Sequence, residues 1–376
     1  MFSTSRSAVA LLTLVPLVSL LLPGARAATD TCNATSLCGA ESPCCSPYGY
    51  CGTGADFCFG GCDPVASHTL DSCMPEPICQ STNITFANFD RILMNQSAYN
   101  GNASMYDFIL DQGNIQNSSA SELVLLLTEE NNGTRLSSTR YVHYGQITAR
   151  LKTGRWGGVV TAFITMSDVK DEIDWEFPGN QTTEGQTNYF WQGFVPTQTA
   201  GQTTGNLTDT FSNYHDYTID WQEDQLQWLI DGNVVRTLTR ESVTNNSTDV
   251  HYYPSTPSRI EISLWPAGIS SEPTGTVEWA GGMIDWNDSD YKAAGHFYAS
   301  FEWIAITCND SSTVNSNITS YVYGSNSSAY TPNILYTNET TIESSGAWGM
   351  SATRSGAAMW SLLACAVAML LGSGLF

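Results

Sequence analysis

The chain has 376 residues, enough for one large domain and a small one, and its acidic residues outnumber its basic residues 36 to 14. The net charge of −22, with no run of Lys or Arg, repels phosphate backbones and argues against a nucleic-acid partner. A neutral polysaccharide is indifferent to such a charge, and an acidic surface kept only for solubility would explain it equally well.

Residues 1–27 are expected to be a secretory signal peptide. Arg6 precedes an apolar run from Ala8 to Leu22, and small residues follow up to Ala28, which is the layout of such peptides. The alternative is an N-terminal membrane helix, but the run is shorter than the roughly 20 residues that a bilayer needs. We therefore expect a secreted protein.

Residues 28–75 are predicted to form a disulfide-rich module. Nine of the eleven cysteines lie between Cys32 and Cys79, in a segment too short to build its own hydrophobic core. Because Cys365 lies in the C-terminal tail, Cys79 and Cys308 remain once the module has formed four internal bridges, and we expect these two to pair. The module's own bridges are expected among Cys32, Cys38, Cys44, Cys45, Cys51, Cys58, Cys62 and Cys73.

Within this module, two adjacent cysteines are followed by a serine, two tyrosines around a glycine, and a Cys-Gly pair. Over residues 32–73 this pattern resembles the hevein-like chitin-binding module. Rigid aromatic rings on a disulfide frame can stack on flat pyranose faces at little entropic cost. The alternative is a structural knot whose aromatic side chains only pack together. The resemblance implies a sugar site made by Ser46, Tyr48, Tyr50 and Phe57.

Residues 76–310 are predicted to be the large domain and to be all-β. Short stretches rich in β-branched and aromatic residues are separated by turn residues, and no amphipathic helix of three turns is found. This pattern predicts an antiparallel β-sandwich. The stretches expected to be strands are 122–127, 144–152, 158–166, 172–177, 216–221, 227–230, 259–265 and 297–307.

One of these stretches has acidic side chains at every second position. Since alternate residues of a strand share a face, Glu172, Asp174 and Glu176 project together while Ile173 and Trp175 point into the core. Two glutamates that lean towards a bound sugar can act as the pair of a retaining glycosidase, with the aspartate between them tuning both pKa values. The alternative is an edge strand with solvated acids, which leaves the alternating apolar residues unexplained.

The sequence Glu-Ile-Asp-Trp-Glu at 172–176 is also the signature of glycoside hydrolase family 16. The resemblance implies a β-jelly-roll sandwich with a concave sugar groove, in which Glu172 is the nucleophile, Glu176 is the acid/base and Asp174 assists. The stretches 144–147, 217–221, 228–232 and 278–282 look like those of the fungal cell-wall Crh-type chitin transglycosylases. That group transfers chitin chains to β-glucan, so both polysaccharides are expected partners and no cofactor is expected.

Further expectations concern metal binding, the core and the residues that line the groove. Scattered histidines without metal-ligand spacing argue against a metal site. Trp221 and Trp228 lie in strand-like runs and are expected in the core. Pro266 departs from the Crh-type pattern and puts the local shape of the groove in doubt. The candidates for lining the groove, each of which could instead be core, are Tyr189, Phe190, Gln192, Trp265 and Trp279.

The C-terminal part is expected to be a Ser/Thr/Asn-rich linker at 311–346 and a removable GPI-attachment signal at 347–376. Small residues, a polar spacer and a terminal apolar tail make up that signal, and the attachment candidates are Ser344, Ser345 and Gly346. A transmembrane anchor is the alternative, although no basic residue follows the tail. Asn-X-Ser/Thr sequons occur about fifteen times, as in a cell-surface glycoprotein.

Three functions remain open from the sequence. The first is a monomeric transglycosylase, GPI-anchored at the outer plasma membrane and cell wall, that cleaves chitin and passes the chain to β-glucan. The second is an endo-β-glucanase or chitinase that acts by hydrolysis, and the third is a non-enzymatic chitin-binding wall protein. The first two share a covalent intermediate and differ in whether a sugar hydroxyl or water attacks it. The three acidic residues argue against the third.

Overall fold

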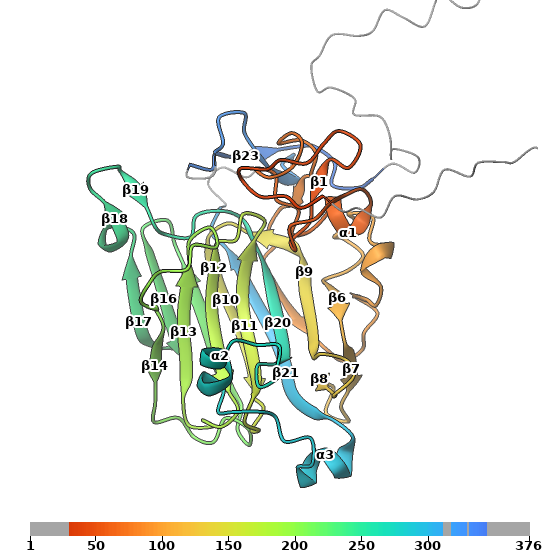
Figure 1. The fold of residues 1–376 in the computed structure, drawn as a ribbon, viewed down its shortest axis with the longest axis vertical. Coiled ribbons are helices and arrows are strands. Elements are labelled where there is room, and N and C mark those ends of the chain that lie inside the picture. Colours follow the sequence, from red (N-terminus) through yellow and green to blue (C-terminus); the bar gives the residue numbers. More distant parts are fainter. Residues whose placement is uncertain (1–29, 311–316, 329–330, 344–376) are drawn as a thin grey trace, which may run out of the picture.

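The structure is a computed structural model that describes residues 30–310, 317–328 and 331–343 (Figure 1). The expected signal peptide at 1–27, the expected GPI signal at 347–376 and the attachment candidates Ser344, Ser345 and Gly346 lie outside these residues. Within the described ranges, no helix has both the length and the apolar character needed to cross a bilayer.

Two eight-stranded sheets make up the large domain, and the expectation of an all-β sandwich is confirmed (Figure 1). The first, here called the front sheet, is antiparallel except where β5 pairs with β6. Its strands, in spatial order, are β14 (Gln202–Thr204), β13 (Gly185–Phe190), β12 (Glu172–Pro178), β11 (Val159–Ser167), β20 (Ser258–Pro266), β9 (Thr134–Val142), β6 (Phe108–Gln112) and β5 (Ile92–Leu93).

The second sheet, here called the back sheet, has β21 near its middle, and β4 (Thr82–Thr85) pairs with that strand off the main path. Its other strands, in spatial order, are β17 (Asn233–Thr239), β16 (Gln225–Ile230), β15 (His215–Trp221), β10 (Gly145–Lys152), β21 (Phe297–Cys308), β8 (Leu123–Leu127) and β7 (Asn114–Asn117). All the stretches predicted as strands from the sequence are strands here, within a few residues.

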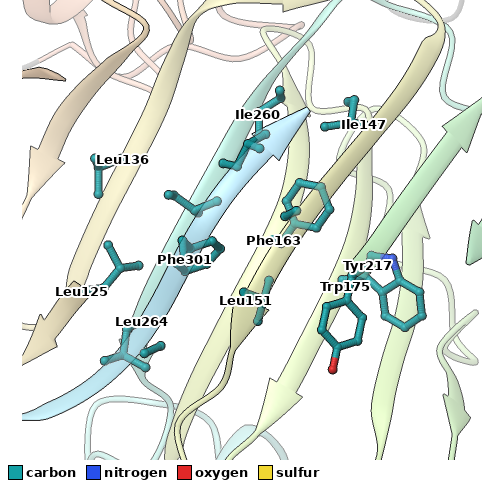
Figure 2. Close-up of a cluster of buried hydrophobic side chains, with 14 of the residues drawn as sticks. Leu125, Leu136, Ile147, Leu151, Phe163, Trp175, Tyr217, Ile260, Leu264 and Phe301 are labelled. Atoms are coloured by element: carbon teal, nitrogen blue, oxygen red, sulfur yellow. The ribbon is translucent and has the colours of Figure 1, made fainter. Parts of the chain in front are cut away.

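The core lies between the two sheets, because alternate side chains of each strand point inward. Figure 2 shows part of it, with Trp175 of the front sheet beside Tyr217 of the back sheet, where the ring centroids are 5.4 Å apart. Trp221 and Trp228 are fully buried, so the prediction that they belong to the core is confirmed.

Helices are few and short in the described part of the chain. They are α1 (Ala55–Cys58), α2 (Thr274–Trp279) and α3 (Ser289–Ala294), with 3-10 turns η1 (Gln96–Ala98) and η2 (Glu241–Val243). A small hairpin joins β18 (Thr244–Asn245) to β19 (Val250–His251), and the module contains the two-residue strands β1 (Cys44–Cys45) and β2 (Cys51–Gly52).

Within the segment 311–346, which was expected to be a linker, two stretches form strands, and this corrects the prediction for those residues. β22 (Ser320–Tyr323) pairs with both β23 (Ile334–Thr337) and β3 (Glu76–Pro77) in a three-stranded sheet. Tyr321 is fully buried there and packs with Tyr141 of β9. Although the segment is rich in Ser, Thr and Asn, it also contains a few tyrosine and isoleucine side chains. These pack against the sandwich and hold the short hairpin in place.

Five disulfides join cysteines of the described residues. Four bridges join cysteines of the module 11 to 14 residues apart in the sequence, namely Cys32–Cys45, Cys38–Cys51, Cys44–Cys58 and Cys62–Cys73. The fifth, Cys79–Cys308, spans 229 residues and links the start of the large domain to the end of β21, as predicted.

Candidate active site

Strand β12 has two chemically different faces. Ile173, Trp175 and Phe177 are at most 1% exposed and point into the core, whereas Glu172 and Glu176 are partly exposed on the other face. Asp174 lies between the two glutamates on that face and is buried. The sequence-based prediction that the three acidic side chains share one face is thus matched by the register, and this side of the front sheet is called the carboxylate face below.

Two tryptophan N–H groups attach β12 to the back sheet. Trp175 Nε1 donates to the carbonyl oxygen of Thr218 on β15 at 3.1 Å. Trp228 Nε1, from β16, donates to the carbonyl oxygen of Asp174 at 3.0 Å. A buried indole N–H needs an acceptor, so each bond removes a desolvation cost and fixes the position of the acidic strand at the same time.

Burial raises the pKa of all three carboxyl groups. The pKa of Glu172 rises to about 7, limited by a hydrogen bond with Asp174 that stabilises the anion. The pKa of Glu176 rises to about 8, through burial first and the nearby charge of Glu172 second. The pKa of Asp174 lies well above its ordinary value, because it is buried between two other acids. The three carboxyl groups therefore titrate as one coupled set, and burial favours their protonated forms.

Asp171, the residue before β12, has the opposite surroundings. Its Oδ1 accepts the backbone N–H of Gln192 at 2.9 Å, and its Oδ2 accepts three donors from the loop before β20. These are the N–H of Ser255 at 2.8 Å and both the N–H and the hydroxyl of Thr256, at 3.1 and 2.7 Å. Asp171 therefore positions the loops on both sides of the acidic strand.

Strand pairing decides which groove candidates lie on the carboxylate face. Phe190 pairs with Glu172 and so shares its face, whereas Tyr189 pairs with Ile173 and points the other way. The Tyr189 ring packs against the core beside the Arg236 guanidinium. Tyr189 therefore does not share the face of the three acids, because a strand turns successive side chains to opposite faces, and it takes the core position that the sequence also allowed.

Trp265 and Trp279 come together, as expected of groove candidates, although the sequence separates them by a loop. Their rings stack with centroids 6.1 Å apart, and both are partly exposed. Trp279 Nε1 donates to Oε1 of Gln186 at 2.7 Å, and Gln186 pairs with Glu176. The two rings thus lie near the Glu176 end of the carboxylate face. A role in sugar binding remains a prediction for both.

The structure also gives the positions of Gln192 and Pro266. Gln192 lies in the turn after β13 at a φ of 50°, and its Nε2 is buried without a hydrogen-bond partner among the described residues. Pro266 is the last residue of β20 and pairs with Val159, where a proline can end a strand. The strand before it is regular enough to hold Trp265 in place.

The four sugar-binding candidates of the module differ in exposure. Tyr48 is 63% exposed and Tyr50 is 49% exposed, so both rings are accessible to a ligand. Phe57 is partly exposed and packs on the disulfides. Ser46 is buried, and its hydroxyl accepts the N–H of Tyr50 at 3.3 Å, which leaves the hydroxyl proton available for another acceptor.

Two residues of the carboxylate face were missed by the sequence analysis. Glu261 on β20 lies level with Asp174 in the sheet, and its charge raises the pKa of Glu172. Arg135 on β9 pairs with Ser263, which is level with Glu176. A charged residue in the middle of an otherwise strand-like run was the available signal for both residues, but pairing between distant strands was needed to place them.

Comparisons with known proteins agree with this geometry. The family model described as "Glycosyl hydrolases family 16" matches residues 102–281. A "Crh-like protein 3" of Botryotinia fuckeliana is 42% identical over 328 residues, which covers 87% of this chain and 71% of the relative. "Congo red hypersensitive protein 2" of Saccharomyces cerevisiae is 41% identical over 315 residues, covering 83% of this chain and 67% of the relative.

Among solved structures, a "Crh5 transglycosylase in complex with NAG" is similar, with a TM-score of 0.56 and 26% sequence identity. The likeness covers 70% of this chain and 95% of the Crh5 chain.

Proposed function

Because the chain belongs to glycosyl hydrolase family 16, among its Crh-like proteins, we propose that it is a cell-wall transglycosylase that cleaves chitin and transfers the chain to β-glucan. The observation that supports this most directly is the acidic strand. Three carboxyl groups share one face of β12, and the outer two are partly exposed with different raised pKa values.

In the first half of the reaction, the Glu172 carboxylate attacks the anomeric carbon of a chitin unit. The bond to the leaving oxygen breaks as the Glu176 carboxyl protonates that oxygen, so a covalent glycosyl-enzyme forms and the shortened chain departs. This assignment follows the family 16 signature at 172–176, in which the first glutamate is the nucleophile and the last is the acid/base. Asp174 assists by donating a hydrogen bond to Glu172.

In the second half, the Glu176 carboxylate takes the proton of a glucan hydroxyl, and that oxygen attacks the same anomeric carbon. The bond to Glu172 breaks, which regenerates its carboxylate, and two inversions give net retention. Rings that hold a sugar near Glu176 and exclude water favour transfer over hydrolysis. Trp265 and Trp279 are the proposed rings, because they lie stacked near that end of the face.

The proposed setting is the cell surface. The expected signal peptide and GPI signal place the enzyme on the outer side of the plasma membrane, and the hevein-like module would hold chitin there. The exposed rings of Tyr48 and Tyr50 support that second role.

One experiment tests the proposal against its alternatives. The full chain is incubated with chitin oligosaccharides and a fluorescent β-glucan acceptor, beside Glu172→Gln and Glu176→Gln variants. A labelled hybrid product that both variants fail to form is the expected result. Shortened oligosaccharide without hybrid would instead indicate a hydrolase, and no change in either sugar would indicate a binding protein. Wild-type activity in either variant would overturn the assignment of the glutamates.

A further inference from the structure

The disulfide-rich module is attached directly to the front sheet. The N–H of Gly61 donates to Oδ1 of Asp168 at 2.9 Å, and the Tyr141 hydroxyl donates to the same oxygen at 2.8 Å. The Phe59 ring meets the Tyr99 ring edge-on, with centroids 5.4 Å apart. Asp168 precedes the acidic strand by four residues, so these contacts fix the module relative to the carboxylates, above β9 in Figure 1.

One of the exposed aromatic side chains of the module also contacts the large domain. Arg135 Nη2 donates to the Tyr48 hydroxyl at 2.7 Å, and the Arg135 guanidinium lies 5.9 Å from the centre of the Tyr48 ring. Even so, 63% of Tyr48 is exposed. The contact therefore holds the hydroxyl end of the side chain and leaves much of the ring surface available to a ligand.

Arg135 lies on the same face as the catalytic candidates. Glu176 pairs with Ala162, Ala162 pairs with Ser263, and Ser263 pairs with Arg135, and residues paired in this way point to one side of a sheet. Strands β12 and β9 are three strand spacings apart, about 14 Å.

The position of Arg135 is also supported by its charged neighbours. Its Nε lies 3.2 Å from Oδ2 of Asp111 and 4.0 Å from Oε2 of Glu261. Glu261 in turn acts on the pKa of Glu172. A row of polar groups thus leads across the sheet from the acidic strand to Arg135, and Tyr48 contacts its far end.

We propose that the module and the acidic strand bind one and the same chitin chain. The chain crosses the front sheet from Glu176 towards β9, passes Arg135, and stacks on Tyr48. The guanidinium offers N–H donors to sugar and acetamido oxygens, which are neutral acceptors, so no anionic ligand is required. This inference rests on the proposed function, since it takes chitin as the polymer that is cleaved.

The alternative is a module that binds separate chitin and acts only as a tether. The two arrangements differ in how many chains one protein binds. With one continuous site, a short oligosaccharide occupies the module and the carboxylate face separately, but a long one spans both and excludes a second chain. A spanning chain also binds more tightly, because its second contact is made within the same complex.

The test uses the full chain with the Glu172→Gln substitution, which removes the nucleophile so that the chain is not cut. Isothermal titration calorimetry with short chitin oligosaccharides is expected to give two chains per protein, and with long ones a single chain bound at least about tenfold more tightly. Two long chains per protein, with the affinity of the short ones, would overturn the proposal.

Variants in the same Glu172→Gln background identify the contact. Tyr48→Ala removes the ring and is expected to weaken binding of the long oligosaccharide about tenfold, whereas Tyr48→Phe keeps the ring and is expected to lose less. Leu37→Ala is the matched control, because Leu37 is an exposed apolar side chain of the same module, 56% exposed. An affinity for the long chain that Tyr48→Ala leaves unchanged would contradict the proposal.

Failure of the proposed function would give a different pattern. If the large domain does not act on chitin, only one short chain binds per protein, and the wild-type protein forms no hybrid product in the transfer assay. If only the shared-chain inference fails, hybrid product forms normally while two long chains bind per protein.

Discussion

The acidic side chains around the start of β12 fall into two regions with opposite surroundings. Asp171 is completely buried and its carboxylate accepts four hydrogen bonds from three residues. On the carboxylate face, Asp174 is just as buried, yet its Oδ1 has no N–H or O–H donor among the described residues. Its neighbours there are two further acids, Glu172 and Glu176.

This difference separates a structural acid from reactive ones. At Asp171 the donors offset part of the cost of burial, which still raises its pKa to about 6, and they leave no oxygen free for a ligand. Where acids face one another without donors, the charge is costly, and a bound sugar or proton relieves that cost. Four substitutions test this difference, and they are taken here in order of decreasing expected effect.

The largest effect is expected at the two glutamates. Glu172→Gln and Glu176→Gln should each lower the rate of hybrid formation by at least about a thousandfold, because one removes the nucleophile and the other the proton donor. A chitin oligosaccharide with an activated aryl leaving group needs no proton, so it should still form a glycosyl-enzyme in Glu176→Gln but not in Glu172→Gln. Mass spectrometry of the intact protein detects that adduct, and an adduct in both variants would contradict the assignment.

The next largest effect is expected on stability at Asp171. Asp171→Asn places an amide NH₂ against backbone donors and should lower the free energy of unfolding by about 3 kcal/mol. Urea denaturation measures this change. Asp249→Asn, at an exposed loop position, is the control and should stay within about 0.5 kcal/mol of the wild type. Equal effects of the two substitutions would remove the distinction between Asp171 and an ordinary surface acid.

A smaller effect on activity is expected at Asp174. Asp174→Asn keeps a hydrogen-bond donor for Glu172 but removes an acid whose titration is coupled to both glutamates, so kcat/KM should fall between about tenfold and a hundredfold. The pH dependence of kcat/KM should change as well, because an amide cannot take part in that coupled titration. A lower rate with an unchanged pH profile would argue that Asp174 only supports the strand.

The smallest effect is a gain in stability. The pKa of Glu176 is raised from 4.5 to about 8 in the folded protein, so its contribution to stability is complete below pH 4.5 and is lost as the pH rises through 8. Glu176→Gln removes the buried charge and should raise the free energy of unfolding by about 2 kcal/mol at pH 8, with little change at pH 4. Glu241→Gln, at an exposed position, is the control. Destabilisation by Glu176→Gln at pH 8 would show that the carboxylate has stabilising partners.

Much of this arrangement could be read from local patterns. The alternation in 172–177 placed the acids on one face, because it depends only on neighbouring residues. The cysteine count identified the pair Cys79–Cys308, because these two were left once the other eight had been assigned to the module. The alternation rule also applied to Tyr189, which is adjacent to Phe190 and so points away from it. The two-residue period of a strand thus decides between the two positions that the sequence had left open for each of them.

Other features depend on contacts between distant segments. Arg135 and Glu261 approach the acidic strand only because β9 and β20 pair in a particular register. The hairpin of β22 and β23 is stabilised by Tyr321, which is buried against Tyr141 from another part of the chain. Composition alone made that segment resemble a linker, since a few buried side chains are hard to distinguish in a polar background.

The cysteines of the five disulfides become available for pairing at different stages of synthesis. The module's bridges close spans of 11 to 14 residues near the start of the chain, so they can form soon after that segment enters an oxidising compartment. Cys308 is synthesised 229 residues after Cys79, and the strand that contains it lies in the middle of the back sheet. Native pairing of these two cysteines therefore requires that β21 has been synthesised and has joined the back sheet. The presence of the Cys79–Cys308 bridge would then indicate that the sandwich has formed.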